Sequence, residues 1–442
     1  SASKEITIKI YDTLQANTTY AINFGESIVD NNEGNPYPFY RYVFSTGEFI
    51  DSLKVNGSVK NALERKTDEF VTIMLYEVDS TFSDSVIYRN KPKYITNTLD
   101  STNTFQLQNL KEGKYLMVAL KDENSNYTFE PNEDKIGFHN DFITLPTEES
   151  FEFNLFTEEP AFKVLRGKLK SGNKLAFGVE GNPENIKIHT LSNVPNDYED
   201  RMMRDTKSDS LLYFYQPNLE QDSLIFSVTN GIKQDSVIVK IRNLEKDSLT
   251  IKATPSRNIL FYEDLKLEGN IPFIRLDRSK ISFFDGDSTE VNYSTKLDSL
   301  RNQYHFSFNK NEGETYKLNL YPGAITDFFG NVNDTLSYNL QTSAYDDFGN
   351  MRLTLTNAKY PIIVQLVDDA GKVKMEKYST QPEVLDFRNV VPASYYIRVI
   401  YDSNGNKKYD TGNYLKKIQP ERVSYYPNAE EIRAGWDIIV DF

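Results

Sequence analysis

The sequence predicts an all-β protein, built as a tandem array of Ig-like and transthyretin-like β-sandwich domains. Short segments rich in Val, Ile, Tyr and Phe recur along the whole chain, clusters of Asn, Asp, Gly and Ser separate them, and two stretches of sequence are used twice. Such segments include EITIKIY, FVTIMLYEV, KYLMVALK, SVIVKIR and YYIRVIY. Short strands at regular spacing with turn residues between them are typical of β-sandwiches.

Composition limits the size, the partners and the chemistry of the protein. A chain of 442 residues suggests about three to five domains. With 64 acidic and 50 basic residues the formal charge is -14, and no basic stripe is present, so nucleic acid is not an expected partner. The absence of cysteine removes disulfides, thiolate metal sites and cysteine nucleophiles. The three histidines, His139, His189 and His305, are too scattered to indicate a zinc site or a catalytic dyad.

The first residues do not have the pattern of an export signal. SASKEITIKIY carries neither a charged segment followed by an apolar one nor an initiator Met, so we expect the interior of a longer precursor. Any signal peptide or lipid anchor is then expected upstream of Ser1. The apolar runs are also too short to predict a transmembrane helix.

One repeat relates residues 105–130 to residues 385–410. The displacement is 280 positions, the difference between 122 and 402, and no gap is needed. The matched pairs are Asn109 with Asn389, Tyr115 with Tyr395, Asp122 with Asp402, Asn124 with Asn404, Asn126 with Asn406, and Glu130 with Asp410. We therefore expect one module that occurs twice.

A looser repeat relates residues 18–46 to residues 314–342. After one insertion and one deletion, the matched pairs are Tyr20 with Tyr316, Asp30 with Asp327, Gly34 and Asn35 with Gly330 and Asn331, and Thr46 with Thr342. The Asp, Gly and Asn residues lie where a turn between strands needs them, so this repeat indicates shared architecture. Only NDYEDRMMRD, residues 196–205, has a helical pattern, with Asn196 or Asp197 as a cap.

These segments resemble known bacterial domains. YAINFGESIVDNNEGNPYPFYRYVFST resembles the C-terminal half of the bacterial Ig-like domain of surface-layer-type proteins, and residues 105–130 and 385–410 resemble transthyretin-like or Cna B-type β-sandwiches. As a whole, the chain is similar to a family of Ig-like-domain lipoproteins of Bacteroidota. That resemblance implies export, anchoring to the outer membrane by a lipidated cysteine that lies outside this chain, and no catalytic motif.

The repeats and the resemblance together predict five units. They are the C-terminal half of a bacterial Ig-like domain (1–47), a transthyretin-like or Cna B-type sandwich (48–157), an unclassified β-sandwich (158–254), a second bacterial Ig-like domain (255–344) and a second transthyretin-like or Cna B-type sandwich (345–442). The linkers TEEP and TSAYDDFG are short, so we expect neighbouring units to touch in a rod or a curved arch.

The Asn-rich turn of the first module has the residues of a calcium loop. Loops of the D-x-[DN]-x-[DN] kind place oxygen ligands at positions 1, 3, 5, 7, 9 and 12, the seventh through a backbone carbonyl. The corresponding residues are Asp122, Asn124, Asn126, Thr128, Glu130 and Glu133. Tyr127 replaces the usual Gly at the sixth position, and the flanks are strands, so structural Ca²⁺ would stiffen a β-turn. The alternative is a set of Asx-turns that satisfy their own backbone.

The second copy has weaker ligands. It offers Asp402, Asn404, Asn406, the Lys408 carbonyl and Asp410, with Asn413 at the twelfth position. A neutral twelfth ligand and the charges of Lys407 and Lys408 are expected to weaken the binding of a divalent cation.

No catalytic motif is present, so we expect a protein that is not an enzyme. The sequence contains no G-x-S-x-G, H-E-x-x-H, P-loop or dinucleotide-binding motif. The leading hypothesis is a scaffold or interaction subunit of the cell envelope, in a hetero-oligomeric complex with outer-membrane or surface proteins such as those that assemble β-barrels or export proteins. The alternatives are a glycan-binding surface protein that uses Tyr-rich loops, such as those of Tyr37 and Tyr425, and a hydrolase with an unrecognised carboxylate pair.

Overall fold

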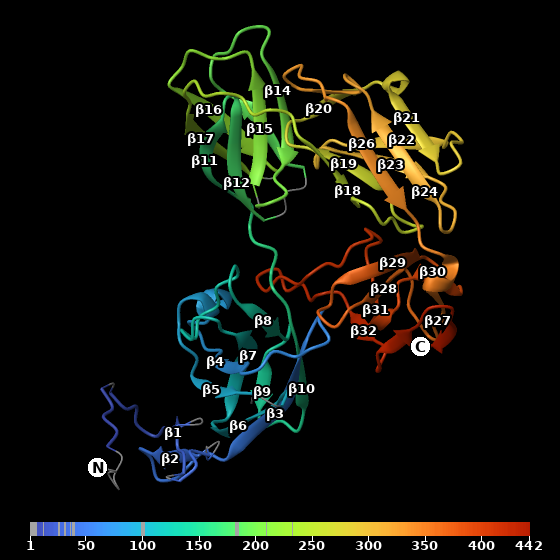
Figure 1. Cartoon of the computed structure of the whole chain (residues 1–442). Helices are drawn as coiled ribbons and strands as arrows, with labels where there is room; N and C mark the ends of the chain where they lie inside the picture. The colour runs from blue at the N-terminus through green and yellow to red at the C-terminus, as the bar shows by residue number, and fades with distance from the viewer. Residues whose placement is uncertain are drawn as a thin grey trace.

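The computed structural model describes residues 7–11, 13–24, 27–30, 32–35, 37, 40–98, 102–181, 185–208, 210–231 and 233–442. Over these ranges the chain consists of β-strands joined by turns, with three short 3-10 helices at Asp84–Tyr88, Arg278–Lys280 and Tyr345–Asp347. The strands collect into successive groups (Figure 1), which confirms the predicted all-β tandem. Within the described part of the chain, none of the helices has the length and apolar character needed to cross a membrane.

The first group, the hairpin unit, is a pair of antiparallel strands. Strands β1 (Thr19–Asn23) and β2 (Arg41–Ser45) pair so that Tyr20 lies opposite Phe44, and their rings stack with centroids 5.5 Å apart. The turn between the strands is held by Asp30, whose Oδ1 accepts the backbone N–H groups of Asn32, Glu33 and Gly34.

The second group, the first module, contains two sheets in the orders β10-β3-β6 and β5-β4-β7-β8, and β9 also pairs with β7. Alternate residues of each strand point into a core that includes Val59, Ile73, Tyr115 and Phe153. The strands are β3 (Leu53–Asn61), β4 (Thr72–Glu77), β5 (Tyr94–Asn97), β6 (Thr104–Leu110), β7 (Gly113–Lys121), β8 (Lys135–Phe138), β9 (Ile143–Leu145) and β10 (Ser150–Leu155).

The third unit is a sandwich of sheets β11-β12-β15-β14 and β13-β16-β17. Its strands are β11 (Lys163–Ser171), β12 (Lys174–Glu180), β13 (Lys187–Thr190), β14 (Glu199–Arg204), β15 (Ser210–Gln216), β16 (Ser223–Thr229) and β17 (Gln234–Lys240). The helix predicted for residues 196–205 is wrong, because this segment forms β14. It pairs with β15 along its whole length and buries Met203, and these tertiary contacts override local helical preference.

The fourth unit packs sheet β18-β19-β23-β22 against sheet β21-β24-β26, with β20 paired to β25. Its strands are β18 (Ile251–Thr254), β19 (Leu265–Gly269), β20 (Phe273–Leu276), β21 (Ile281–Asp285), β22 (Tyr293–Asp298), β23 (Gln303–Phe308), β24 (Thr315–Leu320), β25 (Ile325–Asp327) and β26 (Leu336–Gln341).

The hairpin unit and the fourth unit share hydrogen bonds as well as sequence. The hydroxyl of Thr342 accepts the backbone N–H of Glu314 at 3.0 Å, and that of Thr46 accepts the N–H of Thr18 at 3.0 Å. The matched tyrosines also behave alike, because the hydroxyls of Tyr316 and Tyr20 each accept a backbone N–H from the residue five positions earlier. The looser repeat therefore reflects one strand–turn–strand structure that occurs twice.

The last group, the second module, repeats the first module strand for strand. Its sheets run in the orders β30-β27-β34 and β29-β28-β31-β32, and β33 also pairs with β31. In both modules the last strand is parallel to the first, as β10 is to β3 and β34 is to β27. The strands are β27 (Gly349–Thr354), β28 (Ile362–Val367), β29 (Val373–Ser379), β30 (Leu385–Val390), β31 (Ala393–Tyr401), β32 (Val423–Tyr425), β33 (Glu430–Ile432) and β34 (Asp437–Asp441).

The last four groups form a closed arrangement (Figure 1). The third and fourth units share an apolar cluster that includes Phe214 and Phe328. The ring of Phe261 in the fourth unit stacks on Tyr345 of the following segment at 4.7 Å. The second module then contacts the first, so the units do not form a straight rod: the chain curves until its second module meets the first.

Candidate cation loops and the contact between the two modules

The carboxylate of Asp122 organises the first Asn-rich loop, directly after β7. Its Oδ1 accepts the backbone N–H of Asn126 at 3.2 Å, and its Oδ2 accepts that of Tyr127 at 2.7 Å. The side-chain oxygen of Asn126 accepts the backbone N–H and the hydroxyl of Thr128, at 2.8 and 2.6 Å. The φ angle of Tyr127 is 60°, a left-handed conformation that glycine provides at the sixth position of calcium loops.

Two acidic side chains meet on the other side of this loop. The amide nitrogen of Asn124 donates hydrogen bonds to Oε2 of Glu130 and to Oε2 of Glu133, both at 2.6 Å. A donor between two carboxylates relieves their mutual repulsion. The loop therefore brings Glu130 and Glu133 to one amide, while the carboxylate of Asp122 is engaged by backbone N–H groups.

The second loop, after β31, has the same internal hydrogen bonds. Asp402 is buried, and its Oδ1 accepts the N–H groups of Gly405 and Asn406 at 2.9 and 3.1 Å. Its Oδ2 accepts the N–H of Lys407 at 2.9 Å, and Lys407 has a φ of 65°. The side-chain oxygen of Asn406 accepts the N–H of Lys408 at 2.8 Å. The two copies thus share one loop conformation.

Asp410 is the single acidic partner of the amides in the second loop. Its Oδ2 accepts the amide nitrogens of Asn404 and Asn406 at 2.5 and 2.7 Å. The ammonium of Lys407 lies 5.1 Å from the centroid of the Tyr378 ring. One carboxylate beside a lysine-bearing turn gives this loop a weaker negative potential than the first.

A buried carboxylate closes the base of the first loop, and the sequence pattern did not identify it. Asp134 accepts the backbone N–H of Glu123 at 3.0 Å and that of Glu130 at 2.8 Å. Burial raises the pKa of Asp134, while these two hydrogen bonds lower it and the charges of Asp122 and Glu130 raise it further.

Glu421 has the same role in the second loop. It accepts the N–H of Ser403 at 2.7 Å and that of Asp410 at 3.2 Å, the residues that align with Glu123 and Glu130. Asp134 follows Glu130 by four residues, whereas Glu421 follows Asp410 by eleven. The second loop therefore contains seven additional residues before it closes, and the constant displacement between the copies ends there.

The side chains of the two loops are not arranged as a ready-made metal site. In the described ranges, no group of three or more acidic or histidine side chains is placed to hold a metal ion. A cation in the first loop would require Asn124 to turn its amide oxygen, in place of its nitrogen, toward Glu130 and Glu133. Calcium binding accordingly stays a prediction, and the first loop is the better candidate site of the two.

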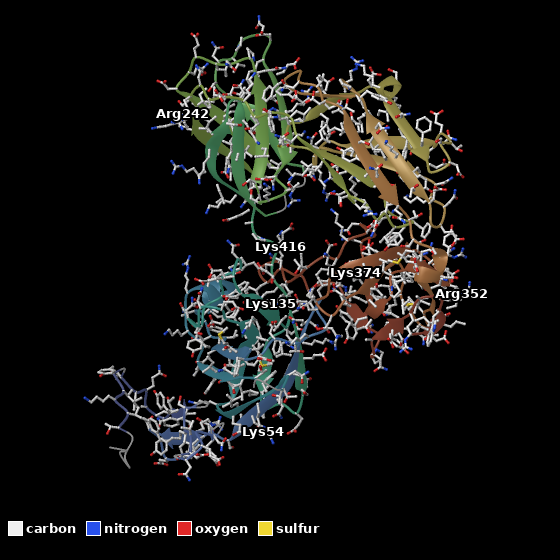
Figure 2. The ribbon with its side chains drawn as sticks, viewed as in Figure 1. Lys54, Lys135, Arg242, Arg352, Lys374 and Lys416 are labelled. Atoms are coloured by element: carbon white, nitrogen blue, oxygen red, sulfur yellow. The ribbon has the colours of Figure 1, made fainter. Side chains whose placement is uncertain are left out.

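The additional residues of the second loop lead the chain onto the first module. Asn413, matched in sequence with the twelfth calcium-loop position, donates to Oε2 of Glu158 at 3.3 Å and accepts the N–H of Lys416 at 3.0 Å. It does not face the second loop. We call residues 411–419 the docking segment, and Figure 2 shows Lys416 of this segment on the side of the first module that faces the third unit.

Tyr414 is the centre of this contact. Its side chain is fully buried in an apolar cluster whose other buried members all lie in residues 62–156, including Met74, Phe129, Phe138 and Phe156. The ring meets that of Phe138 edge to face at 5.2 Å. A residue of the second module thus completes the hydrophobic core of the first.

Glu158 fixes the backbone of the docking segment. It is buried, its Oε1 accepts the N–H of Tyr414 at 2.5 Å, and burial raises its pKa against the opposing charge of Lys416. Gly412 allows the close approach, because a Cβ there would lie 2.5 Å from the ring of Phe156. The ammonium of Lys417 is 2.8 Å from Asp84.

Further side chains extend the contact. Gln419 donates to the Phe138 carbonyl at 2.9 Å, and the hydroxyl of Tyr425 donates to the Leu63 carbonyl at 2.8 Å. Tyr425, which the sequence suggested as a free loop tyrosine, is therefore part of the contact between the modules. A visible signal for the docking segment was its apolar content, since Tyr414, Leu415 and Ile418 lie in what otherwise reads as a polar turn.

One family model matches the start of the chain. Residues 1–46 match a family model described as a bacterial Ig-like domain. Among curated proteins, none matches this chain. The protein is thus a tandem of all-β units whose first residues are similar to a bacterial Ig-like domain.

Solved structures of tandem domains are similar over large parts of the chain, but only loosely. Domains 4–9 of the surface layer protein SbsC share 10% identity and a TM-score of 0.21, covering 92% of this chain and 64% of that one. Tandem Ig repeats of Dlar share 12% identity and a TM-score of 0.15, covering 42% of this chain and 99% of that one. These TM-scores are low, and the strand pairing of the chain defines its fold.

The contact between the modules predicts the effect of shortening Tyr414. Removing a fully buried aromatic ring costs about 3 kcal/mol or more, so Tyr414→Ala is expected to separate the two modules while both remain folded. Small-angle X-ray scattering should then report a larger radius of gyration than for the unmodified chain.

The matched control is Tyr127→Ala, which removes the same atoms from a tyrosine that is 37% exposed in the first loop. It should leave the radius of gyration unchanged. An unchanged radius for Tyr414→Ala, with the first module intact by circular dichroism, would show that the docking segment does not hold the modules together.

Proposed function

We propose that the protein is a non-catalytic scaffold of the bacterial cell envelope that supplies binding surfaces to a complex of outer-membrane proteins. The observation that carries this proposal is the burial of Tyr414 in the first module, since it joins the ends of a four-unit array. Units joined in a ring keep their outward faces in fixed relative positions, as a multi-site binding platform requires. The match of residues 1–46 to a bacterial Ig-like domain supports a surface location.

The proposed setting of this scaffold rests on the resemblance of its sequence to Ig-like-domain lipoproteins of Bacteroidota. Similarity to Bacteroidota lipoproteins supports a lipid-anchored surface protein, with partners among the machineries that assemble β-barrels or export proteins. His139 has a structural role in the first module, because it packs between the rings of Phe151 and Phe153 at 5.4 and 4.8 Å. His305, in the fourth unit, is 3.7 Å from Asp264.

A second candidate function is glycan binding by the hairpin unit. Its turn and strands expose Tyr37, Tyr40 and Tyr42, with exposed fractions of 64%, 44% and 53%. Exposed tyrosine rings offer flat apolar faces with a polar edge, a surface that also suits sugars. We place this function second because protein interfaces are enriched in the same side chain.

The scaffold proposal is tested by affinity purification from membranes under mild detergent. The unmodified chain should recover the same outer-membrane proteins in fixed stoichiometry, and Tyr414→Ala should recover at least tenfold less of them. Tyr127→Ala should behave like the unmodified chain.

Two results would contradict the scaffold. One is that no stoichiometric protein partner is recovered from membranes of the native host. The other is specific binding on a glycan array that Tyr37→Ala and Tyr42→Ala abolish, which would support the second function instead.

The structural role of calcium is a separate proposal, for the first loop. Adding Ca²⁺ to chelated protein should raise its melting temperature, because a ligand at about 100 times its Kd stabilises the folded state by about 2.7 kcal/mol. Glu133→Gln removes one of the two carboxylates at Asn124, and the affinity for Ca²⁺ should fall by about tenfold. Isothermal titration calorimetry measures the Ca²⁺ affinity of the unmodified chain and of the Glu133→Gln variant.

Glu112→Gln is the matched control, because it removes the same charge from an exposed position of the same module. It should leave calcium affinity unchanged. If Ca²⁺ changes neither the melting temperature nor the heat of titration of the unmodified chain, the loop is a self-satisfied turn.

A further inference from the structure

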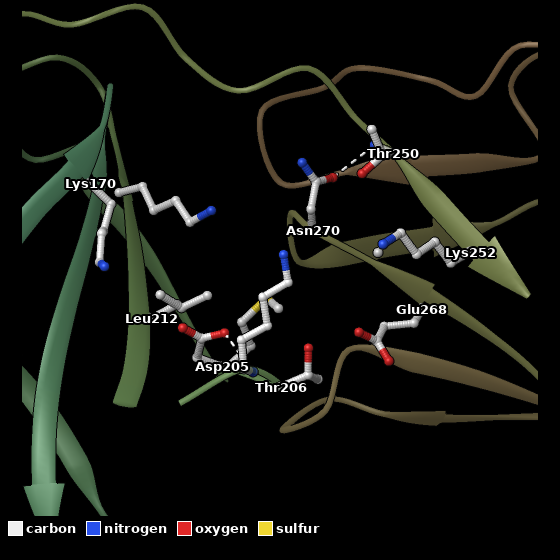
Figure 3. Close-up of a pocket in the computed structure, with 12 residues that line it drawn as sticks. Lys170, Asp205, Thr206, Leu212, Thr250, Lys252, Glu268 and Asn270 are labelled. Atoms are coloured by element: carbon white, nitrogen blue, oxygen red, sulfur yellow. Dashed lines mark hydrogen bonds between the residues drawn. The ribbon is translucent and has the colours of Figure 1, made fainter. Parts of the chain in front are cut away.

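A cavity of about 440 Å³ lies where the third and fourth units meet. Its apolar floor is formed by Met203 and Leu212, which belong to the cluster that joins the two units. Figure 3 shows Lys170 on the side of the third unit and Lys252 on the side of the fourth. A ligand in this cavity would therefore contact both units at once.

Lysine side chains dominate the charged lining. Four of them, Lys170, Lys174, Lys207 and Lys252, line the cavity. Lys174 is neutralised by Asp247 at 2.8 Å. Across the described residues, the other three lysines make no ion pair.

The two carboxylates of the cavity are already engaged. Asp205 accepts the backbone N–H of Lys207 at 3.0 Å and the hydroxyl of Ser208 at 2.8 Å. Glu268 accepts the amide of Gln303 at 2.7 Å. Among the described residues neither carboxylate is within ion-pair distance of a lysine ammonium of the cavity, but Glu268 lies opposite Lys252 in the β18–β19 pair, and both negative charges lower the positive potential.

Neutral groups complete the wall and hold it in place. The side-chain oxygen of Asn270 accepts the N–H of Thr250 at 2.7 Å, and its amide donates to the Ser248 carbonyl at 2.9 Å, which ties the entrance of β18 to the end of β19. Gly269 lines the cavity without a side chain, because a Cβ there would lie 2.4 Å from the ring of Phe273.

We propose that this junction binds a phosphate or sulfate group, either free or carried by a small sugar. Lys170, Lys207 and Lys252 share the lining of the cavity with Asp205 and Glu268, and Lys174 is offset by Asp247, so three lysines minus two carboxylates leave the lining with one net positive charge in a chain whose formal charge is -14. An oxyanion accepts several hydrogen bonds at once, and both units offer donors to it: Lys170 and Lys207 from the third unit and Lys252 from the fourth. The site is independent of the proposed scaffold function.

Titration calorimetry on the full chain tests this proposal with sodium phosphate, sodium sulfate and glucose 6-phosphate as probes. Sodium chloride at equal ionic strength corrects for general screening. Phosphate and sulfate should bind, and Lys170→Glu and Lys252→Glu should each weaken their binding at least tenfold. Glucose 6-phosphate binding tenfold more tightly than phosphate would identify a sugar-borne group, and equal binding would identify the free oxyanion.

Lys187→Glu and Lys240→Glu are the matched controls, because they make the same charge change at exposed positions of β13 and β17 in the third unit. Each should bind phosphate within twofold of the unmodified chain. The proposal is overturned if phosphate and sulfate give no more heat than chloride, or if the control variants lose binding as much as Lys170→Glu and Lys252→Glu. Circular dichroism of each variant verifies that it is folded.

Discussion

The arrangement of the chain depends on the burial of Tyr414 in the core of a module to which it does not belong. A tandem array whose neighbours touch only in sequence order can bend at each junction. One further contact between the first and second modules removes that freedom, because the third and fourth units are then held at both ends. The cost of ordering the docking segment is offset by an aromatic ring in a closed apolar cluster and by its bond to Glu158.

The two modules show how a repeated loop can serve different purposes. In both copies a carboxylate at the first position gathers backbone N–H groups, and a buried carboxylate closes the base. The first loop closes early and presents Glu130 and Glu133 to one amide. The second loop closes seven residues later and uses the added length to reach the other module. The same rigid turn therefore supports a candidate cation site in one copy and an inter-module contact in the other.

Local sequence pattern was sufficient for the fold, and not for the long-range contacts. Alternating apolar residues predicted the strands, and the constant displacement paired Tyr115 with Tyr395, whose hydroxyls both donate to a backbone carbonyl four residues earlier. The helix predicted for residues 196–205 was wrong because the pairing of this segment with β15 outweighs the helical preference of its residues. Tyr414 and Glu158 could not be recognised as partners from the sequence. The local pattern of residues around each of them does not indicate which distant part of the chain it contacts.

The docking segment joins the two modules, and chemical cross-linking of one position in each module tests this contact most directly. Asn140 and Gln419 are exposed, their side-chain oxygen and nitrogen are 3.3 Å apart, and the chain has no cysteine to compete. In the double variant Asn140→Cys and Gln419→Cys, a short bis-maleimide should link the thiols within one chain at dilute concentration, and Tyr414→Ala in the same background should abolish the link. Free reaction of both thiols without any intramolecular link would contradict the closed arrangement.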